Sequence, residues 1–284
     1  MEIFNKTGSV REYLNEKRRQ GLSIGLVPTM GALHEGHMSL VEKAVEENDI
    51  ALCTIYVNPT QFNNDNDFEN YPVSMNQDLE MLEKGHCNVA FCPANEEIYA
   101  VDECIDFEVG YLDSIMEGVF RKGHFKGVAR VVAKFFNITR PDRAYFGQKD
   151  LQQFVLIDNL NKSLKFDIEL RRMPIVREAD GLAMSSRNRR LDSTQRGKAV
   201  NFYKALENAR ELIINREGLE LVGRETEKMF HDLSGVTLEY FEIVNPVTLR
   251  QITTLENNVE IALCIAGYVG DVRLIDNTIF HLPN

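Results

Sequence analysis

Apolar residues in the first 176 positions alternate between short continuous runs and runs at helical spacing. Residues 22–27 and 50–57 are almost entirely apolar, which is typical of parallel strands covered on both faces. Between them, apolar residues recur at helical spacing from 38 to 45, with charged residues on the other side. Further strands are predicted at 88–93, 144–147 and 167–176, and further helices at 8–20 (with Ser9 as N-cap), 74–84, 128–138 and 151–160. Strands that alternate with helices predict a parallel sheet.

After residue 176 the pattern changes. Residues 177–190 are loop-like and are followed by two predicted helices, at 194–214 and 219–233. Three strand-like runs then follow one another at 236–244, 259–268 and 271–275. Adjacent strands after helices favour an antiparallel sheet in an α+β domain. We therefore predict an α/β protein with a Rossmann-like parallel-sheet domain at 1–176 and a smaller α+β domain at 177–284.

Composition narrows the classes of function. The chain of 284 residues has 32 basic and 43 acidic side chains, and its net charge of −11 disfavours non-specific binding to nucleic acid. No apolar run approaches the length of a membrane span, and the first residues do not resemble a signal peptide. Five cysteines without a C-x-x-C pair predict reduced thiols in a cytoplasmic protein and argue against a zinc site.

The strongest candidate for chemistry is the turn between the first predicted strand and helix, Pro28 to Met38. The turn contains two glycines and opens a helix near His37, so unpaired amide N–H groups would face a phosphate. His34 and His37 are three residues apart and can point into one pocket. Gly36 removes a side chain where a nucleotide would approach the backbone. A helix cap or a surface role for either histidine alone is the alternative interpretation.

A second strand–turn–helix junction follows the strand at 144–147. Lys149 supplies a mobile positive charge at the start of the next helix. Asp150 has two interpretations, a helix cap or a ligand of Mg²⁺ beside phosphates. Gln153 lies about one turn into the helix.

Three other segments carry polar groups. Gln61 follows the strand at 50–57, at the edge where parallel sheets bind ligands, although a solvent-facing loop glutamine fits the position as well. Residues 121–127 contain three basic residues and a histidine between glycines, which fits an anion-binding loop or a contact between domains or subunits. Residues 184–190 carry two hydroxyls and three guanidiniums in an otherwise acidic chain, which favours a loop that grips phosphate over a solvated face.

Other nucleotide and hydrolase motifs are missing from the sequence. No G-x-G-x-x-G follows a predicted strand, and neither G-x-x-x-x-G-K-[ST] nor G-x-S-x-G occurs. The turn at 28–37 is therefore the strongest nucleotide signal.

The segment PTMGALHEGH at 28–37 resembles the HxGH signature of the adenylyl-transferring α/β superfamily. Within it, five segments in order resemble the pantoate–β-alanine ligases: that segment, YVNPTQF at 56–62, GHFKGVARVVAKFFNI at 123–138, PDRAYFGQKDLQQ at 141–153 and MSSRN at 184–188. DNTIF at 276–280 is similar to the closing strand of the family but less diagnostic. One such match could arise by chance, but five in order could not.

The resemblance implies a reaction. Enzymes of this family join (R)-pantoate to β-alanine through a pantoyl adenylate, releasing pyrophosphate and AMP. It also implies ATP as a substrate and a homodimer formed through the first domain. Mg²⁺ is the expected cofactor because it suits the charge on the phosphates and pyrophosphate. The sequence itself shows no interface.

The resemblance further implies site residues. His37 would be the proton-donating catalytic residue and His34 its partner, with Lys149 and Arg187 also catalytic. Gln61 and Gln153 would hold pantoate, with Gln61 also near β-alanine. Asp150 is the candidate Mg²⁺ ligand from its own chemistry, not from the resemblance. The implied ATP-binding residues are Met30, Gly31, Ala32, Leu33, His34, Glu35, Gly36, His37, Gly147, Gln148, Lys149, Asp150, Val176, Met184, Ser185, Ser186 and Arg187. Glu35 stands where the family often has Asp, a small change that puts no catalytic role in doubt.

Two alternatives differ from this ligase. A nucleotidyltransferase of the same superfamily would need extra cations where Gln61 and Gln153 stand. A non-catalytic nucleotide-binding protein would not need His34, His37, Lys149 and Arg187 together. We also expect the loop at 184–188 to move with the second domain, close on ATP and exclude water from the labile adenylate.

Overall fold

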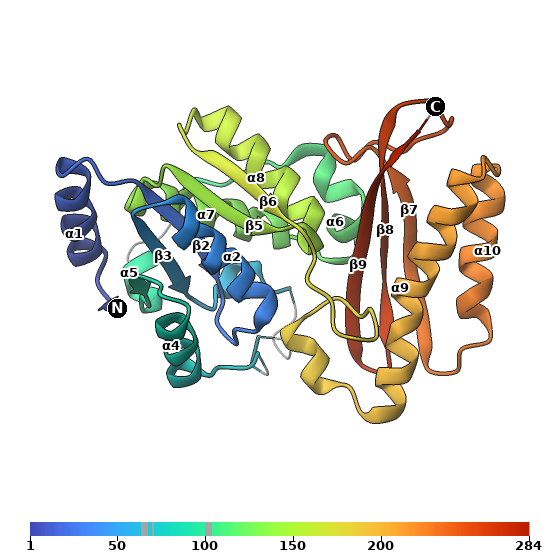
Figure 1. Cartoon of the computed structure of the whole chain (residues 1–284), viewed down its shortest axis with the longest axis horizontal. Helices are drawn as coiled ribbons and strands as arrows, with labels where there is room; N and C mark the ends of the chain where they lie inside the picture. The colour runs from blue at the N-terminus through green and yellow to red at the C-terminus, as the bar shows by residue number, and fades with distance from the viewer. Residues whose placement is uncertain (64–67, 70, 100–103, 284) are drawn as a thin grey trace. The chain divides into compact units, whose positions relative to one another are not determined.

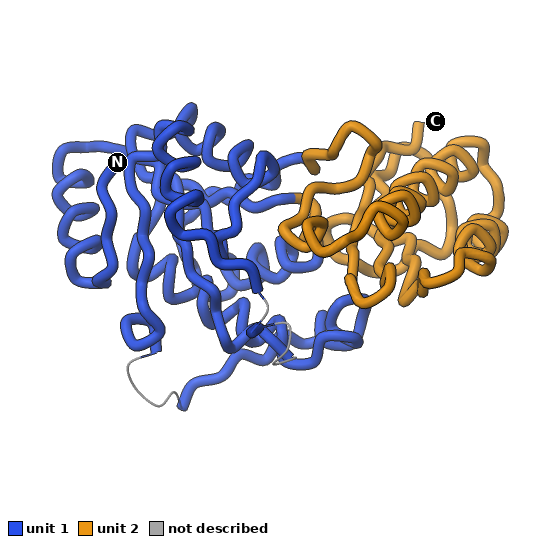
Figure 2. Tube along the Cα trace, turned by 90° about the horizontal axis from the view of Figure 1, so that it is seen from below, with its two compact units in different colours: residues 1–147, 152–174 blue, residues 148–151, 175–284 orange. Residues whose placement is uncertain are grey.

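The computed structural model describes residues 1–63, 68–69, 71–99 and 104–283 (Figure 1). They form two compact units, which are coloured separately in Figure 2. Unit 1 comprises Met1–Gly147 and Gln152–Pro174, and unit 2 comprises Gln148–Leu151 and Ile175–Asn284. The domain boundary that we predict after residue 176 lies close to the later change of unit. The short segment at 148–151 groups with unit 2, which the sequence does not predict.

Unit 1 is built on a parallel sheet of six strands in the order β1-β4-β3-β2-β5-β6. The strands are β1 (Glu2–Phe4), β2 (Ile24–Thr29), β3 (Ile50–Ile55), β4 (Val89–Phe91), β5 (Arg143–Gly147) and β6 (Glu169–Met173). Every residue of β3 is buried, as its continuous apolar run predicts. The parallel sheet predicted for the first domain is confirmed.

The helices of unit 1 that lie wholly within the described residues are α1 (Thr7–Arg19), α2 (Glu35–Glu47), α4 (Met75–Lys84), α5 (Asn95–Ile98), α6 (Met116–Phe120), α7 (His124–Thr139) and α8 (Leu151–Leu164). Short 3-10 helices occupy Pro59–Gln61 (η1) and Gly110–Ser114 (η2). Helix α2 packs along β2, β3 and β5 (Figure 1). Leu40, Val41 and Ala44 of α2 meet Val27 and Cys53 of the sheet in one buried cluster.

The start of the chain differs from the prediction. Residues 2–4 form a sixth strand beside β4, which a run of only three residues does not indicate. Helix α1 begins at Thr7, so Ser9 is not its N-cap. The carboxylate of Glu97 in α5 caps this helix instead, accepting the backbone N–H and the hydroxyl of Thr7, each at 2.9 Å. A cap from a distant helix leaves no local signal in the sequence.

Unit 2 contains an antiparallel sheet in the order β7-β8-β9, as predicted. Its strands are β7 (Val236–Val244), β8 (Val259–Val269) and β9 (Val272–Leu282). Helices α9 (Ser193–Ile214) and α10 (Leu219–His231) lie along this sheet (Figure 1), and 3-10 helices occupy Gln148–Asp150 (η3) and Ser186–Arg190 (η4). Strand β9 runs well past residue 275, where the predicted strand ends.

Asp192 caps α9 through a capping box with Gln195, in which each side chain bonds the other residue's backbone N–H. Phe202 of α9 and Phe230 of α10 meet at a ring-centroid distance of 5.1 Å in the core over the sheet. In neither unit does the structure describe a helix that has both the length and the apolarity needed to cross a membrane.

Candidate functional site

The residues predicted to carry chemistry fall into one group in each unit. In unit 1 they lie at the carboxyl ends of β2 and β3 and at the start of α2, with Gly147 at the end of β5 and Gln153 in the first turn of α8. In unit 2 they lie in η3 and in the segment from 176 to 187. Each group has its own supporting contacts, so we describe the two groups separately.

The turn after β2 is held in an unusual backbone conformation. Gly31 has φ of +80° and Ala32 has φ of +50°, in the left-handed region that only glycine adopts readily. Asp78 of α4, only 1% exposed, stabilises this turn: its two carboxylate oxygens accept the backbone N–H groups of Ala32 and Leu33, each at 2.8 Å. The Ser74 hydroxyl donates to the same carboxylate at 3.0 Å. The buried carboxylate of Asp78, which belongs to another helix, therefore stabilises this turn.

The two histidines lie together at the start of α2. His34 is the N-cap residue, and the rings of His34 and His37 face each other with centroids 4.0 Å apart. The backbone N–H of His37 donates to the His34 carbonyl at 2.8 Å. The predicted pairing of these side chains is thus present in the structure. The helix opens at Glu35, two residues before the predicted position.

Gln61 is not a solvent-facing loop residue, because only 7% of it is exposed. Its amide Nε2 lies 3.0 Å from the Sδ of Met30, which places it beside the turn after β2. Asn58 donates to Gln61 Oε1 at 3.1 Å. This bond fixes the orientation of the Gln61 amide, so that Oε1 faces Asn58 and Nε2 faces Met30. Tyr99 in turn donates to Asn58 Oδ1 at 2.8 Å.

The basic segment at 121–127 contacts the backbone of Gln61 and Thr60. The ring of His124 contacts the Gln61 carbonyl at 2.8 Å. Gly127 lets α7 approach η1 closely, since a Cβ there would lie 2.2 Å from the carbonyl oxygen of Thr60. Lys126 forms ion pairs with Asp106 and Glu108. Of the two interpretations left open by the sequence, these contacts favour neither; they give the segment a supporting role.

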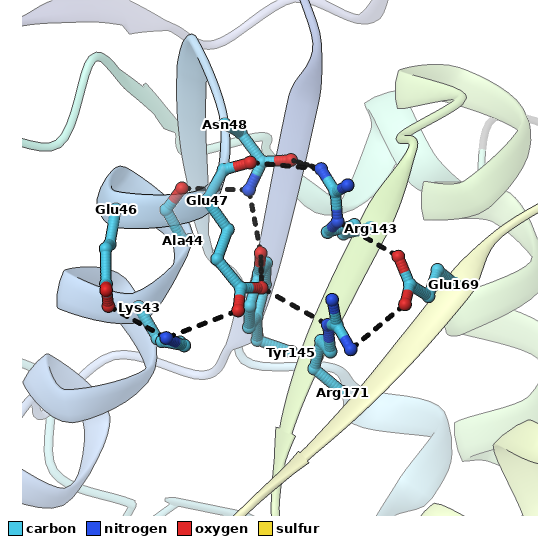
Figure 3. Close-up of polar contacts among 9 residues, drawn as sticks. All are labelled: Lys43, Ala44, Glu46, Glu47, Asn48, Arg143, Tyr145, Glu169 and Arg171. Carbon is cyan, nitrogen blue, oxygen red and sulfur yellow. Dashed lines mark hydrogen bonds and ion pairs between the residues drawn. The ribbon is translucent and has the colours of Figure 1, made fainter.

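The far end of α2 is fastened to β5 and β6 (Figure 3). The Tyr145 hydroxyl donates to Glu47 Oε2 at 2.9 Å and accepts from Asn48 Nδ2 at 2.7 Å. Arg143 donates to the Glu47 carbonyl at 3.0 Å, and Arg171 donates to the Glu47 carboxylate at 3.2 Å. Burial raises the pKa of Tyr145 to about 12, so this hydroxyl stays a donor at neutral pH. The network fixes the helix whose first turn carries the histidine pair.

In unit 2, the η3 turn is held by Asn277 of β9. The Asn277 side chain donates to the carbonyl oxygens of Gln148 and Lys149, each at 2.9 Å. Its Oδ1 accepts from the Gln148 side chain at 3.1 Å. The side-chain amide of Gln148 is therefore engaged within the protein. Lys149 and Asp150 are half-buried in the same turn.

Asp276, next to Asn277, forms a two-pronged ion pair with Arg177. The guanidinium contacts the two carboxylate oxygens at 2.6 and 3.0 Å and also donates to the Asn277 carbonyl at 3.1 Å. Burial raises the pKa of the Asp276 carboxyl, and the Arg177 guanidinium opposes this shift. Arg177 also stacks over the ring of Tyr203 at 4.3 Å. Five donors in a planar fork suit arginine to this position.

The predicted phosphate-gripping segment is ordered by contacts within unit 2. The Met184 N–H donates to the Val176 carbonyl at 3.0 Å, and Asn188 donates to Glu178 at 2.7 Å. Ser185 is the N-cap of η4 and its hydroxyl accepts the N–H of Arg187 at 3.3 Å. Ser186 is buried and Arg187 half-buried.

Gln153 lies half-buried in the first turn of α8, and its neighbour Gln152 is the buried one. Gln152 accepts the N–H of Glu117 at 3.0 Å and donates to the Leu112 carbonyl at 2.8 Å. Gln152 thus braces α6 and η2 against α8.

Several supporting residues are given no supporting role by the sequence prediction, which notes only His124 among them, as part of the segment 121–127: Asn58, Asp78, His124, Tyr145, Arg177, Asp276 and Asn277. Asn58, His124, Tyr145, Asp276 and Asn277 lie inside segments that match the family pattern, which is a signal that could have singled them out. Asp78 and Arg177 have no such signal, because each acts on backbone or side chains distant in sequence.

Comparisons with known proteins agree on one family. The family model described as pantoate-beta-alanine ligase matches residues 2–279. The pantothenate synthetase of Thermosipho melanesiensis is 46% identical over 279 residues, covering 98% of this chain and 99% of that protein. The pantothenate synthetase of Bacteroides thetaiotaomicron is 42% identical over 277 residues, covering 98% of each.

Solved structures give the same result. The crystal structure of pantothenate synthetase from Thermus thermophilus has a TM-score of 0.91 at 35% identity, covering 98% of this chain and 99% of that one. The pantoate-beta-alanine ligase of Francisella tularensis, complexed with beta-gamma ATP and beta-alanine, has a TM-score of 0.80 at 35% identity, with coverage of 98% and 97%.

Proposed function

The chain belongs to the pantoate–β-alanine ligase family, and from this premise we propose how its residues carry the reaction. The enzyme is an AMP-forming ligase that uses ATP to condense (R)-pantoate with β-alanine to pantothenate. In the first step a carboxylate oxygen of pantoate attacks the α-phosphorus and the bond to the leaving pyrophosphate breaks. In the second step the amine nitrogen of β-alanine attacks the acyl carbon of the adenylate and AMP leaves.

The observation that carries this assignment is the histidine pair at the start of α2, next to the strained turn after β2. The pantoate carboxylate is already ionised at neutral pH, so the first step needs no general base. It needs in-line positioning and donors aimed at the charge that develops on the phosphoryl oxygens. We propose that His37 donates a proton or hydrogen bond there, with His34 holding its ring, and that residues 30–37 line the nucleotide.

Residues of unit 2 supply the positive charges. We propose that Lys149 and Arg187 neutralise phosphate charge, with Ser185 and Ser186 as hydroxyl donors. Gly147, Gln148, Asp150, Val176 and Met184 complete the proposed ATP contacts. Since Asn277 engages both the side chain and the carbonyl oxygen of Gln148, the backbone N–H of Gln148 is the part that we propose for ATP. The proposed closure of residues 184–188 over the adenylate would keep water from it.

Gln61 and Gln153 are the proposed binding residues for pantoate, with Gln61 also near β-alanine. The buried amide of Gln61 is oriented by Asn58, so that its N–H groups point toward Met30. An amide that presents donors suits a hydroxyl or carboxylate oxygen of the substrate. A phosphorylated acceptor would instead require cations, which disfavours the nucleotidyltransferase alternative.

Mg²⁺ would enter with ATP, and Asp150 is its proposed protein ligand. Among the residues that the structure describes, no three His, Cys, Asp or Glu side chains gather into a metal site. A magnesium ion that is held largely by phosphates and water needs only one or two carboxylates. A single half-buried Asp150 beside Lys149 fits that requirement. The ion would shield the phosphate charge during attack.

Two further properties are part of the proposal. We propose a homodimer formed through unit 1, in which Val119 (49% exposed) and Phe120 (42% exposed) offer apolar surface. We propose the cytoplasm as the compartment, since all five cysteines are free thiols. Sedimentation of the purified protein measures the first, and fractionation of cells measures the second.

The decisive experiment is exchange of labelled pyrophosphate into ATP without β-alanine. We expect exchange that requires pantoate and that falls by about 100-fold or more in His37→Ala, since removing one donor to a developing charge typically costs that much. His231→Ala, at an exposed position at the end of α10, is the matched control and should retain exchange. ATP binding without any exchange would refute the adenylate mechanism and favour the non-catalytic alternative.

A further inference from the structure

We propose that Asn277 is a positioning residue, which holds the Lys149 turn in place for the phosphates of ATP. This inference rests on the proposed role of Lys149 in ATP binding. It goes beyond that role by making phosphate binding depend on β9, a strand that the reaction scheme does not otherwise use.

The geometry of Asn277 fits this role closely. The residue is 2% exposed, and its side chain forms three hydrogen bonds with the two residues Gln148 and Lys149. Both side-chain N–H donors are used on carbonyl oxygens of the turn. The anchor therefore engages the carbonyl side of the turn, while the N–H groups and the Lys149 ammonium are the groups that phosphate would need.

The stretch of β9 that carries Asn277 is itself fixed. The Arg177 guanidinium donates hydrogen bonds to the Asp276 carboxylate and to the Asn277 carbonyl. It also donates to the Gly181 carbonyl at 3.0 Å. Asp276 Oδ1 accepts the N–H of Asn277 at 2.7 Å. Because these hydrogen bonds fix the backbone of Asn277, its side chain can set the position of the η3 turn.

The same strand ties the η3 turn to the second phosphate-binding segment. Arg177 pairs across an isolated bridge with Ala183, directly before Met184. Met184 is bonded to Val176, which precedes Arg177. Lys149 and Ser185–Arg187 are thus connected through contacts inside unit 2 alone. This explains why the residues 148–151 group with unit 2, although β5 before them belongs to unit 1.

Asn277→Ala tests the role, because it removes the anchor without introducing a charge. Asn161→Ala is the matched control: Asn161 donates one bond to the Ile168 carbonyl at 2.9 Å, in unit 1 and at a position with no proposed part in the reaction. Calorimetry with MgATP alone measures the dissociation constant, and thermal unfolding of each variant measures stability. We expect ATP binding to weaken about tenfold or more in Asn277→Ala and to be unchanged in Asn161→Ala.

A double-mutant cycle with Lys149→Ala separates positioning from general loss of stability. If Asn277 acts through Lys149, its substitution in the Lys149→Ala background should weaken ATP binding much less than in the wild type. Asn277→Ser, which is small and polar, repeats the measurement if Asn277→Ala does not fold.

Three results would overturn the proposal. The first is unchanged ATP affinity in folded Asn277 variants, and the second is wild-type ATP affinity in Lys149→Ala. The third is a double variant whose loss of ATP affinity equals the product of the losses in Asn277→Ala and Lys149→Ala. Failure of the proposed reaction would appear differently. Wild-type protein that binds ATP but shows no pantoate-dependent exchange would count against the ligase mechanism, while the affinities above would still decide the role of Asn277.

Discussion

The two strand–turn–helix junctions of this enzyme are alike in sequence pattern but are held by opposite chemistry. The turn after β2 is anchored by a carboxylate, Asp78, which accepts backbone N–H groups. The turn after β5 is anchored by a carboxamide, Asn277, which donates to backbone carbonyl groups. The first anchor fixes a strained backbone with left-handed residues at Gly31 and Ala32, and the second holds a 3-10 turn without such strain.

The difference shows what each turn requires. A buried carboxylate that accepts two N–H groups compensates the cost of left-handed backbone at a non-glycine residue, Ala32. An anchor on the carbonyl oxygens instead leaves the N–H side of the second turn for an anion. We infer that the anchor of the first junction maintains a strained backbone conformation. The anchor of the second junction leaves backbone N–H groups for binding an anion.

The largest effect should follow from replacing the first anchor. In Asp78→Asn the new NH₂ group faces a backbone N–H, so one bond is lost and a donor is left buried. A loss of about 1–3 kcal/mol in positioning corresponds to about 5- to 150-fold in kcat/KM for ATP. Asp142→Asn is the matched control, because Asp142 accepts the N–H of Ile24 at 2.7 Å at the opposite end of β2. Steady-state kinetics measure kcat/KM for both variants. Equal losses in Asp78→Asn and Asp142→Asn would refute a special role for Asp78.

A glycine pair tests the strain directly. Gly31→Ala should destabilise the protein by about 1–2 kcal/mol, because alanine is strained at positive φ. Its Cβ would also lie 2.9 Å from Asp78 Oδ2 and 3.0 Å from Ile55 Cγ2. Gly147→Ala at the second junction meets nothing within 4 Å and should change the free energy of unfolding by less than about 1 kcal/mol. Urea denaturation measures both, and equal losses would contradict a difference in strain.

The smallest effect concerns a third anchor, with the chemistry of Asp78 but near the surface. Glu97 accepts from Thr7 and Lys6, which lowers its pKa to about 2. Because the folded pKa lies below the unfolded value, the contribution of Glu97 to stability is present above about pH 4.5 and is lost as the pH falls toward 2. Wild type and Glu97→Gln should therefore differ in thermal midpoint at about pH 6, and the difference should shrink steadily below about pH 4.5 and vanish only as the pH approaches about 2. A constant difference across this range would show that the charge of Glu97 is irrelevant.

Much of the fold could be predicted because its signals are local. The continuous apolar run of β3 and the periodicity of α2 follow from residues that are neighbours in sequence. The glycines and histidines between 31 and 37 likewise mark their own turn. The parallel direction of the strands in unit 1 follows from the alternation of strands and helices. The antiparallel sheet of unit 2 follows from strands that are adjacent in the chain.

The contacts of the anchors could not be predicted, because each joins residues far apart in the chain. Asp78 acts 45 positions from Leu33, Glu97 acts 90 positions from Thr7, and Asn277 acts 128 positions from Lys149. A single sequence shows that an aspartate or asparagine is present but not which backbone it meets. For the same reason the local pattern favours Ser9 as the cap of α1, although Glu97 is the residue that caps it.

The contact between Asn277 and Lys149 has a consequence for the order in which the enzyme matures during synthesis. Translation adds about 5–20 residues per second, so the 128 residues between Lys149 and Asn277 take on the order of ten seconds to make. During that interval the strands and helices of unit 1 can assemble, histidine pair included, while the lysine turn waits for its partner strand. Unit 1 of a nascent chain can thus reach its fold before Asn277 is available to hold the Lys149 turn.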